Sequence, residues 1–327
     1  MPRIMPALRN GKGVWGLMAA AGIAAGLALA VFPRPESGVA PGPGTTSGPA
    51  GTAVPAATKA YGAGERVVFR MDDPRGDDRG PGTYRYPIDP SFVPGLYDLQ
   101  SFTVLVAQDN IVFDLTFGTI ANPFRAPEGF YHQLIDIYIH TGPGGRTEPL
   151  IPGPRVRFDP AYPWTARVRA EPFGGSRLDR ADDESGSGVT SFPARALVLD
   201  DGRTIRVSVP EEALGTPDRS WRYYVLIGGF DPYGPDGYRT VRPQATAWSF
   251  GGDPSGAGPL VIDLLAPRFW PSQARQLGSF RQNPPLAARL HPVGPSRWPR
   301  WALPALALLF LAAAAFCILR LMRRRRA

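Results

Sequence analysis

DDPRGDDRGPGTYRYPIDPSFVPGLYD, residues 72–98, packs acidic residues, glycines and prolines into one segment directly after a strand-like run. Glycines adopt positive φ at little cost, prolines hold φ near one value, and Asp carboxylates accept hydrogen bonds from nearby backbone N–H groups. This combination predicts one long turn system that is rigid.

Four carboxylates lie within seven residues of this segment: Asp72, Asp73, Asp77 and Asp78. Such a group repels itself unless a hard cation such as calcium, or arginines and backbone donors, compensate the charge. The spacing does not follow the EF-hand pattern, so two interpretations stay open. In one, Asp73, Asp77 and Asp78 are calcium ligands. In the other, the carboxylates form hydrogen-bonded turns and pair with the neighbouring arginines.

Beyond this segment the apolar residues alternate with a period of two. In residues 111–118, every second side chain, beginning with Ile111, is apolar and shares one face. Similar short runs, separated by Pro- and Gly-rich turns, are residues 66–71, 99–107, 132–140, 194–199, 204–209, 221–227, 245–250 and 260–264. Only residues 211–214 suggest a helical turn, and residues 174–188 are expected to form a mobile polar loop. The pattern predicts an all-β fold, an antiparallel sandwich or barrel.

Over residues 66–280 the chain resembles the C-terminal module of glucodextranase, a family that is also attached to amylopullulanases and is grouped with the DOMON-like, family-9-type carbohydrate-binding folds. The motifs that carry the resemblance follow one another in the family's order: residues 72–98, 122–124 (NPF), 129–130 (GF), 136–139 (DIYI), 209–215, 221, 229–252 and 261–267 (VIDLLAP). Phe124 stands where the family is expected to have Trp. The resemblance implies an antiparallel β-sandwich of the jelly-roll type that binds carbohydrate.

The N-terminal part of the chain differs from the module in composition. Residues 1–32 contain an uninterrupted apolar run behind three basic residues, which predicts a signal peptide or an uncleaved signal anchor. Residues 33–60 are rich in Pro, Gly, Ala and Thr and predict a disordered stalk. The module itself is expected to span residues 61–290.

After the module, residues 291–300 are expected to form a tether, and residues 301–322 a transmembrane helix. The run 301–319 carries no charge and would be about 28 Å long as a helix. Four arginines in residues 323–327 favour a cytoplasmic tail, which places the module on the extracytoplasmic side. The membrane protein is therefore expected to be single-pass, or two-pass if the N-terminal segment is retained.

The net charge of +8 comes from the two ends of the chain and not from the module, so it does not indicate nucleic-acid binding. The single cysteine, Cys317, lies in the C-terminal apolar run, and the module therefore has no disulfide. No GxSxG, HExxH or P-loop motif occurs, and we expect no enzymatic activity.

Flat aromatic rings stack on sugar rings, so exposed aromatics are the candidate carbohydrate-binding residues. Trp164 lies in a Pro-rich turn, and Tyr233 and Tyr238 lie in the loop DPYGPDGY. These three are predicted to be exposed and to bind sugar, with packing of the loops as the alternative. Trp221 and Trp248 lie in strand-like runs and are predicted to be core residues.

The expected function is that of a membrane-anchored carbohydrate-binding module without a catalytic domain, which holds an envelope or extracellular polysaccharide near the cell surface. Two alternatives remain. One is a structural or protein-interaction domain with the same fold. The other is a haem-binding redox domain of the DOMON type, with Met71 and either His132 or His140 as axial ligands.

Overall fold

The computed structural model describes residues 64–181 and 188–296. The predicted N-terminal segment, stalk, transmembrane helix and Arg tail all lie outside these residues. Within the described ranges, no helix combines the length and the apolar character that a membrane crossing requires.

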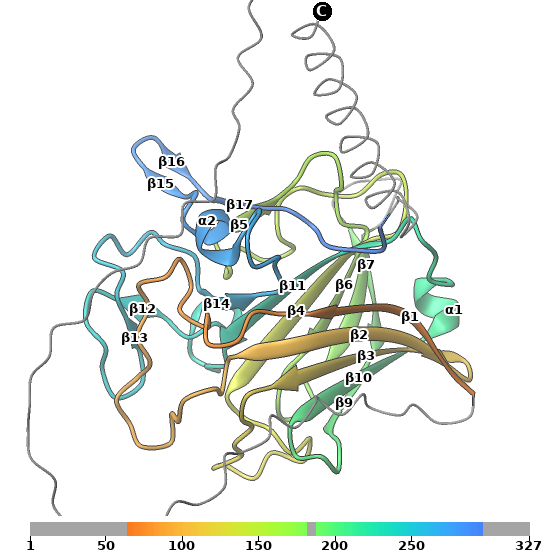
Figure 1. Ribbon diagram of the computed structural model, residues 1–327, viewed down its shortest axis with the longest axis horizontal. Helices are drawn as coiled ribbons and strands as arrows, with labels where there is room; N and C mark the ends of the chain where they lie inside the picture. Colours follow the sequence, from red (N-terminus) through yellow and green to blue (C-terminus); the bar gives the residue numbers. More distant parts are fainter. Residues whose placement is uncertain (1–63, 182–187, 297–327) are drawn as a thin grey trace, which may run out of the picture. The chain divides into compact units, whose positions relative to one another are not determined.

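Two antiparallel sheets form the fold, as the alternating sequence pattern predicts (Figure 1). The first has the order β1 (Glu65–Asp72), β2 (Leu99–Ala107), β3 (Asn110–Phe117), β10 (Thr204–Pro210) and β9 (Arg195–Val198). The second has the order β14 (Val261–Leu264), β11 (Arg222–Gly229), β4 (Gln133–His140), β6 (Ala166–Ala170), β7 (Arg177–Ala181) and β8 (Val189–Pro193).

Short elements complete the described chain. Three two-stranded pairs are β5 (Val156–Phe158) with β17 (Ala288–Leu290), β12 (Val241–Arg242) with β13 (Phe250–Gly251), and β15 (Arg281–Gln282) with β16 (Pro285–Leu286). The helical turns are α1 (Glu211–Leu214), where the sequence predicts one, together with η1 (Pro235–Gly237) and α2 (Gln273–Leu277).

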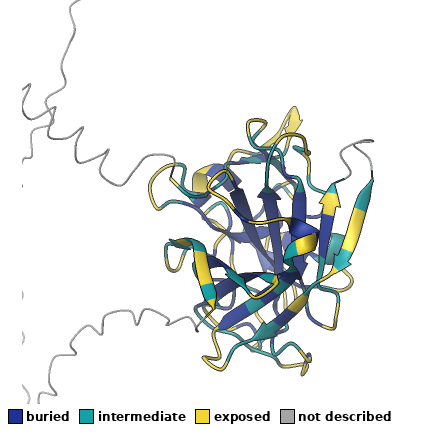
Figure 2. Cartoon of the chain, turned by 90° about the vertical axis from the view of Figure 1, so that its right-hand side faces the viewer, coloured by how far each residue is buried: buried dark blue, intermediate teal, exposed yellow. Residues whose placement is uncertain are grey.

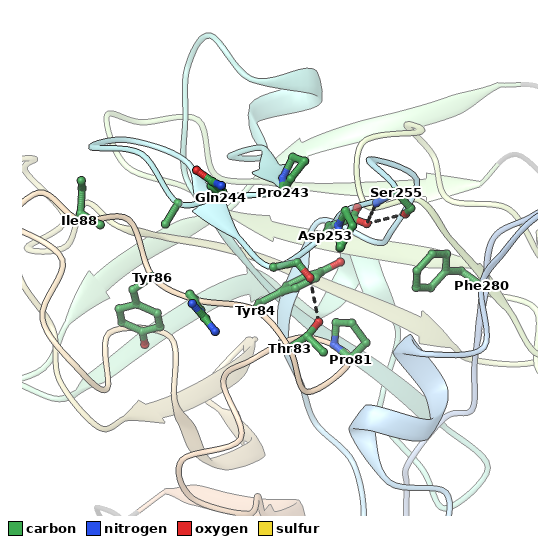
Figure 3. A pocket seen from close by; sticks show the side chains of 14 residues that line it. Pro81, Thr83, Tyr84, Tyr86, Ile88, Pro243, Gln244, Asp253, Ser255 and Phe280 are labelled. Carbon is green, nitrogen blue, oxygen red and sulfur yellow. Dashed lines mark hydrogen bonds between the residues drawn. The ribbon is translucent and has the colours of Figure 1, made fainter.

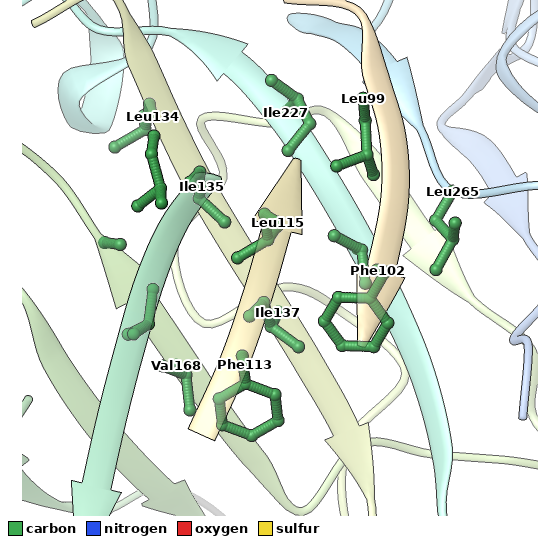
Figure 4. Packing of buried hydrophobic residues seen from close by; sticks show 14 of the residues in the cluster. Leu99, Phe102, Phe113, Leu115, Leu134, Ile135, Ile137, Val168, Ile227 and Leu265 are labelled. Atoms are coloured by element: carbon green, nitrogen blue, oxygen red, sulfur yellow. The ribbon is translucent and has the colours of Figure 1, made fainter. Parts of the chain in front are cut away.

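The main core lies between the two sheets (Figure 4). Phe102 and Phe113 from the first sheet face Ile137 and Ile227 from the second, and all four are fully buried. Each such side chain stabilises the fold by about 1.5–3 kcal/mol when it leaves water. The period-two alternation of β3 therefore has a direct physical cause, since only one face of that strand meets the core.

The outer face of the second sheet is also covered. Tyr138 and Tyr224 point away from the main core and form a second cluster with Phe158, Trp164 and Leu290. The strands β4 and β11 are consequently buried on both faces, and the exposed residues lie mainly in the loops and edge strands (Figure 2). The parallel pair of β5 and β17 supplies part of this cover.

The turn system of residues 72–98 is present as predicted. At Gly80, φ is +57°, and a Cβ atom there would lie 2.3 Å from Cδ2 of Tyr84. The Gly80 N–H also donates to the carbonyl oxygen of Ile262 at 2.8 Å, which ties the turn to β14. Only glycine fits this combination of φ and close approach.

Two local predictions are wrong. Residues 245–250 form no complete strand, because Thr246 and Ser249 close a tight turn through backbone and side-chain hydrogen bonds. Residues 174–188 are not one polar loop, because they include β7. Asp179 of that strand is buried and pairs with Arg167, with Nη2 and Oδ2 2.5 Å apart. A paired charge can be buried in a strand that the sequence makes appear solvated.

Candidate functional site

Three carboxylates converge at the junction between the turn system and the second sheet. Asp73 follows β1, Asp77 lies in the turn, and Asp263 belongs to β14. One carboxylate oxygen from each lies within 4.8 Å of the others. Asp73 and Asp263 are buried, and Asp77 is partly buried.

Backbone donors satisfy only part of this acidic cluster. The N–H of Ala266 donates to Oδ1 of Asp73 at 2.9 Å, and the N–H groups of Leu99 and Leu264 donate to Asp263. Oδ2 of Asp73 and Oδ1 of Asp77 are buried without a hydrogen-bond partner. Buried oxygens without a partner raise the free energy of the folded state.

The pKa values of the three carboxyl groups show that their charged forms are disfavoured. Burial, together with the neighbouring carboxylates, raises the pKa of Asp73 to about 9 and that of Asp77 to about 6. The pKa of Asp263 is also well above its ordinary value, first because of burial and then because of Asp73 and Asp77. A hard cation coordinated by oxygens would hold all three carboxylates in the charged form.

Aromatic side chains form a second feature, here named the aromatic patch: Phe124, Tyr131, Phe173 and Trp248. The ring centroid of Tyr131 lies 4.4 Å from that of Phe124 and 6.1 Å from that of Phe173. The rings of Phe124 and Trp248 are 6.2 Å apart. Phe124, Phe173 and Trp248 are 49%, 55% and 41% exposed, so three of the four rings reach solvent.

Side-chain hydrogen bonds hold the loops that carry Phe124 and Phe173. The Asn122 amide exchanges two bonds of 2.8 Å with the backbone of Ala126, which encloses Phe124 in a short turn. Phe173 has a φ of +62°, and the Glu128 carboxylate accepts its N–H at 3.0 Å. A non-glycine residue held in this region stores strain, and such strain often marks functional positions.

Phe92 and Arg239 pack against Trp248 and hold it in place. Its ring packs edge-on against Phe92 with a centroid distance of 5.4 Å. The Arg239 guanidinium lies over both rings and donates to the carbonyl oxygen of Trp248 at 2.6 Å. The indole is therefore fixed in position although much of it faces water.

The model of one protein family matches residues 68–292, and its description is the C-terminal, SLH-like binding module of glucodextranase. The chain belongs to this family. The match begins inside β1 and ends just after β17, so the glucodextranase-type module includes both sheets, the acidic cluster and the aromatic patch. The comparison with curated proteins gave no match.

Two of the three aromatics proposed from the sequence are not exposed in the glucodextranase-type module. Trp164 is fully buried, and its Nε1–H donates to the Glu148 carbonyl oxygen at 2.7 Å. Tyr238 is also fully buried, and its hydroxyl donates to Oδ2 of Asp136 at 2.6 Å. Both predictions of exposure are wrong because their turns fold over the outer face of the second sheet, so neither ring can stack on a sugar.

Tyr233 is 97% exposed, as predicted, and a role in binding stays a prediction for it. Trp221 is a core residue as predicted, but the same prediction for Trp248 is wrong. Trp248 occupies the tight turn that replaces the expected strand.

The predicted metal ligands are rearranged as well. Asp73 and Asp77 come together, but Asp78 instead accepts a short hydrogen bond from the Tyr86 hydroxyl. The third member of the cluster, Asp263, was missed because it is distant in sequence. An aspartate in the apolar run VIDLL was the available signal, since a carboxylate is seldom buried without a partner or a metal.

A surface cavity of about 1040 Å³ lies between residues 81–88 and residues 243–255. Figure 3 shows it with Tyr86 and Ile88 at one end and Phe280 at the other. Several of its polar groups bond within the fold: the Thr83 hydroxyl donates to the Gly252 carbonyl oxygen, and Asp253 accepts bonds from Ser255. These polar groups of the cavity wall thus hold the surrounding loops together.

The residues proposed for haem ligation lie in or beside different sheets. Met71 belongs to β1 of the first sheet, whereas His132 and His140 flank or end β4 of the second. Nδ1 of His140 lies 2.7 Å from the Pro163 carbonyl oxygen, and His132 is buried against Phe92. Burial and Arg239 lower the pKa of His132 to about 4. The haem alternative gains no support from these positions.

Proposed function

We propose that this glucodextranase-type module binds a glycan and that the aromatic patch is its binding surface. The observation that carries the proposal is that three exposed rings come from three separate segments and that hydrogen bonds and ring packing hold them in place. A sugar presents C–H groups that pack on such rings, and a fixed surface loses little entropy on binding. The family match to a binding module supports the same function.

The proposal extends to the context of the module. A jelly-roll sandwich of the DOMON type, with no catalytic domain, would stand outside the membrane and hold an envelope or extracellular polysaccharide near the cell surface. The apolar run of residues 301–319 and the arginines after it support anchoring through the C-terminus.

Calcium is the proposed cofactor, held by Asp73, Asp77 and Asp263. The three carboxylates fit a hard cation, because two buried oxygens lack a partner. The ion would neutralise the acidic cluster and join the turn system to β14. Its role would be structural, since the cluster and the aromatic patch share no residue.

A protein-interaction role is the remaining alternative, because an exposed apolar patch also suits a protein partner. A test of glycan binding distinguishes the proposed function from this alternative. A screen of the full-length chain on a glycan array is expected to give binding to at least one class of polysaccharide. Absence of binding to every glycan would contradict the proposed function.

Replacing Trp248 or Phe124 by Ala is expected to weaken glycan binding about tenfold or more, because each loses an apolar contact that is typically about 1–3 kcal/mol. Titration of the bound glycan by calorimetry would measure the change. Phe269→Ala is the matched control, since Phe269 is also an exposed ring but lies outside the aromatic patch. Equal affinity of the wild type and both patch variants would place the binding surface elsewhere.

The proposed topology predicts a specific pattern of proteolysis. Protease added to intact cells, after removal of any outer barrier, is expected to digest the module and to leave a short C-terminal fragment with the Arg tail. An antibody against a C-terminal tag would detect the fragment. Survival of the module, while a known surface protein is digested, would contradict the extracytoplasmic location.

A further inference from the structure

A second cavity, of about 610 Å³, is lined by residues of β17, α2 and the hairpin of β15 and β16. Figure 1 shows these elements close together. The basic side chains that line it are Arg157, Arg275, Arg281, Arg289 and His291. None of the described residues that line this basic cavity is acidic. Elsewhere in the described chain several arginines pair with carboxylates, as Arg167 does with Asp179 and Arg206 with Asp114, so this concentration of one sign needs an explanation.

Two of the arginines stand directly side by side. Arg157 of β5 and Arg289 of β17 are partners in the parallel ladder. The residues on either side of them, such as Phe158 and Leu290, are buried in the second core cluster, so the two arginines share the outer face. Like charges in register destabilise a sheet unless a counter-charge lies between or near them.

The protein supplies only part of that counter-charge. Asp159 binds both Arg289, with Nη2 and Oδ1 2.9 Å apart, and His291, with Nδ1 and Oδ2 2.8 Å apart. Arg157 donates from Nε to the Ala287 carbonyl oxygen at 3.2 Å. Nε of Arg289 is buried and has no hydrogen-bond partner.

The remaining two arginines lie at the rim of the cavity and are exposed. The guanidinium of Arg275 lies 3.8 Å from the ring centroid of Trp270, which orients it without neutralising it. Arg281 belongs to the β15–β16 hairpin. Among residues 64–181 and 188–296, neither side chain forms an ion pair with a carboxylate.

We propose that this basic cavity binds a phosphate group, presented as a phosphate monoester or diester. Guanidinium groups match the oxygens of phosphate with two parallel hydrogen bonds, and several of them together bind it as a charge-assisted site. A phosphate would supply the missing counter-charge between Arg157 and Arg289. The site is separate from the aromatic patch and does not depend on glycan binding.

We expect the phosphate group to belong to a phospholipid headgroup. Trp270 is 66% exposed at the cavity rim, and amphipathic rings of this kind favour the membrane interface. His291 also precedes the predicted membrane helix by ten residues, which span at most about 35 Å. A soluble phosphate ester carries the same chemistry, so the experiment needs an arm for each.

Binding is tested by calorimetry with the full-length chain in an uncharged detergent. One arm titrates glycerol phosphate, and the other uses micelles that contain phosphatidylglycerol, with phosphatidylcholine micelles for comparison. We expect binding in at least one arm and weaker binding at high salt, because salt screens the charges. Binding only to phosphatidylglycerol identifies the lipid headgroup as the source, and binding to glycerol phosphate shows that the phosphate group is sufficient.

The double variant Arg275→Gln with Arg281→Gln is expected to bind about tenfold more weakly and to keep the wild-type melting temperature, since both side chains are exposed. The charge-matched control is Arg195→Gln with Arg219→Gln, two exposed arginines that do not line the cavity. The control is expected to bind as the wild type does. Absence of binding in both arms, or equal weakening in both double variants, would overturn the proposal.

Discussion

Replacement of Asp136 by Asn is expected to lower the free energy of unfolding by about 3–5 kcal/mol, because it leaves a buried guanidinium without its counter-charge. Asp136 is fully buried in β4, and its two oxygens accept bonds from Nε and Nη2 of Arg169 at 2.9 and 2.7 Å. Arg167 and the Tyr238 hydroxyl also contact this carboxylate.

The pKa of Asp136 determines the pH range of this effect. Burial alone would raise it, but Arg169 and Arg167 outweigh burial and hold the pKa well below its ordinary value of 3.8. A depressed carboxyl pKa stabilises the folded state above the unfolded-state pKa, and that contribution decreases as the pH falls below about 4. The difference in the free energy of unfolding between the wild type and the Asp136→Asn variant should therefore be largest near neutral pH.

Denaturant unfolding of the full-length chain at pH 7 would measure the change. Asp72→Asn is the matched control, because Asp72 also pairs with an arginine, Arg70, but its side chain is 75% exposed. An exposed ion pair contributes at most about 1 kcal/mol. Equal destabilisation by the two substitutions would show that the buried contacts of Asp136 stabilise the fold no more than an exposed ion pair does.

Calcium at about 100 times its dissociation constant is expected to stabilise the folded module by about 2.7 kcal/mol, because the ion binds the assembled cluster and not the unfolded chain. The affinity should rise with pH. Burial raises the pKa of Asp73 to about 9, so near pH 7 calcium must displace a proton from the cluster.

The calcium-free chain should show the opposite dependence on pH. A carboxyl whose pKa is raised on folding keeps its proton in the folded state and loses it in the unfolded state. The contribution of Asp73 to stability therefore decreases as the pH rises from about 4 to about 9. Calcium should reduce this loss, since it stabilises the charged form.

Melting temperatures in calcium and in excess chelator at pH 8 would test both expectations. Asp263→Asn and Asp77→Asn are expected to remove the response to calcium. Asp78→Asn is the control from the same turn, and it should keep the response because Asp78 binds Tyr86 instead. Identical melting of the wild type with and without calcium would contradict the metal site.

The alternation of apolar residues predicts the two sheets, because the core requires an apolar side chain at every second position of a strand. The run that begins at Ile111 meets apolar partners on one face only, and the period of two follows directly. The same reasoning fails for Trp164 and Tyr238, because it assumes that the other face of a sheet is open to water. Here the second cluster and the buried ion pairs cover that face, and a single sequence gives no local sign of such a cover.

The candidate site was predictable only in part for a related reason. Asp73 and Asp77 were found because they are close in sequence, whereas Asp263 reaches them through the pairing of distant strands. Phe124 was noted in the sequence only as a departure from the Trp expected in the family and was not predicted to bind sugar. Its contact with Trp248 depends on two loops that meet only in the folded chain. The local sequence pattern shows which residue types are present, but the topology of the fold determines which of them come into contact.

The two ends of the module are joined directly, which has a kinetic consequence. Ala266 donates to Asp73, and Gln273 donates to the carbonyl oxygen of Asp77, so contacts at the start of the fold require residues almost 200 positions later. Contacts of such long sequence separation form late, and they slow the folding of β proteins. An interaction absent from the transition state acts on the unfolding rate and not on the folding rate. Calcium at Asp73, Asp77 and Asp263 would therefore lengthen the lifetime of the folded module and leave its rate of formation nearly unchanged.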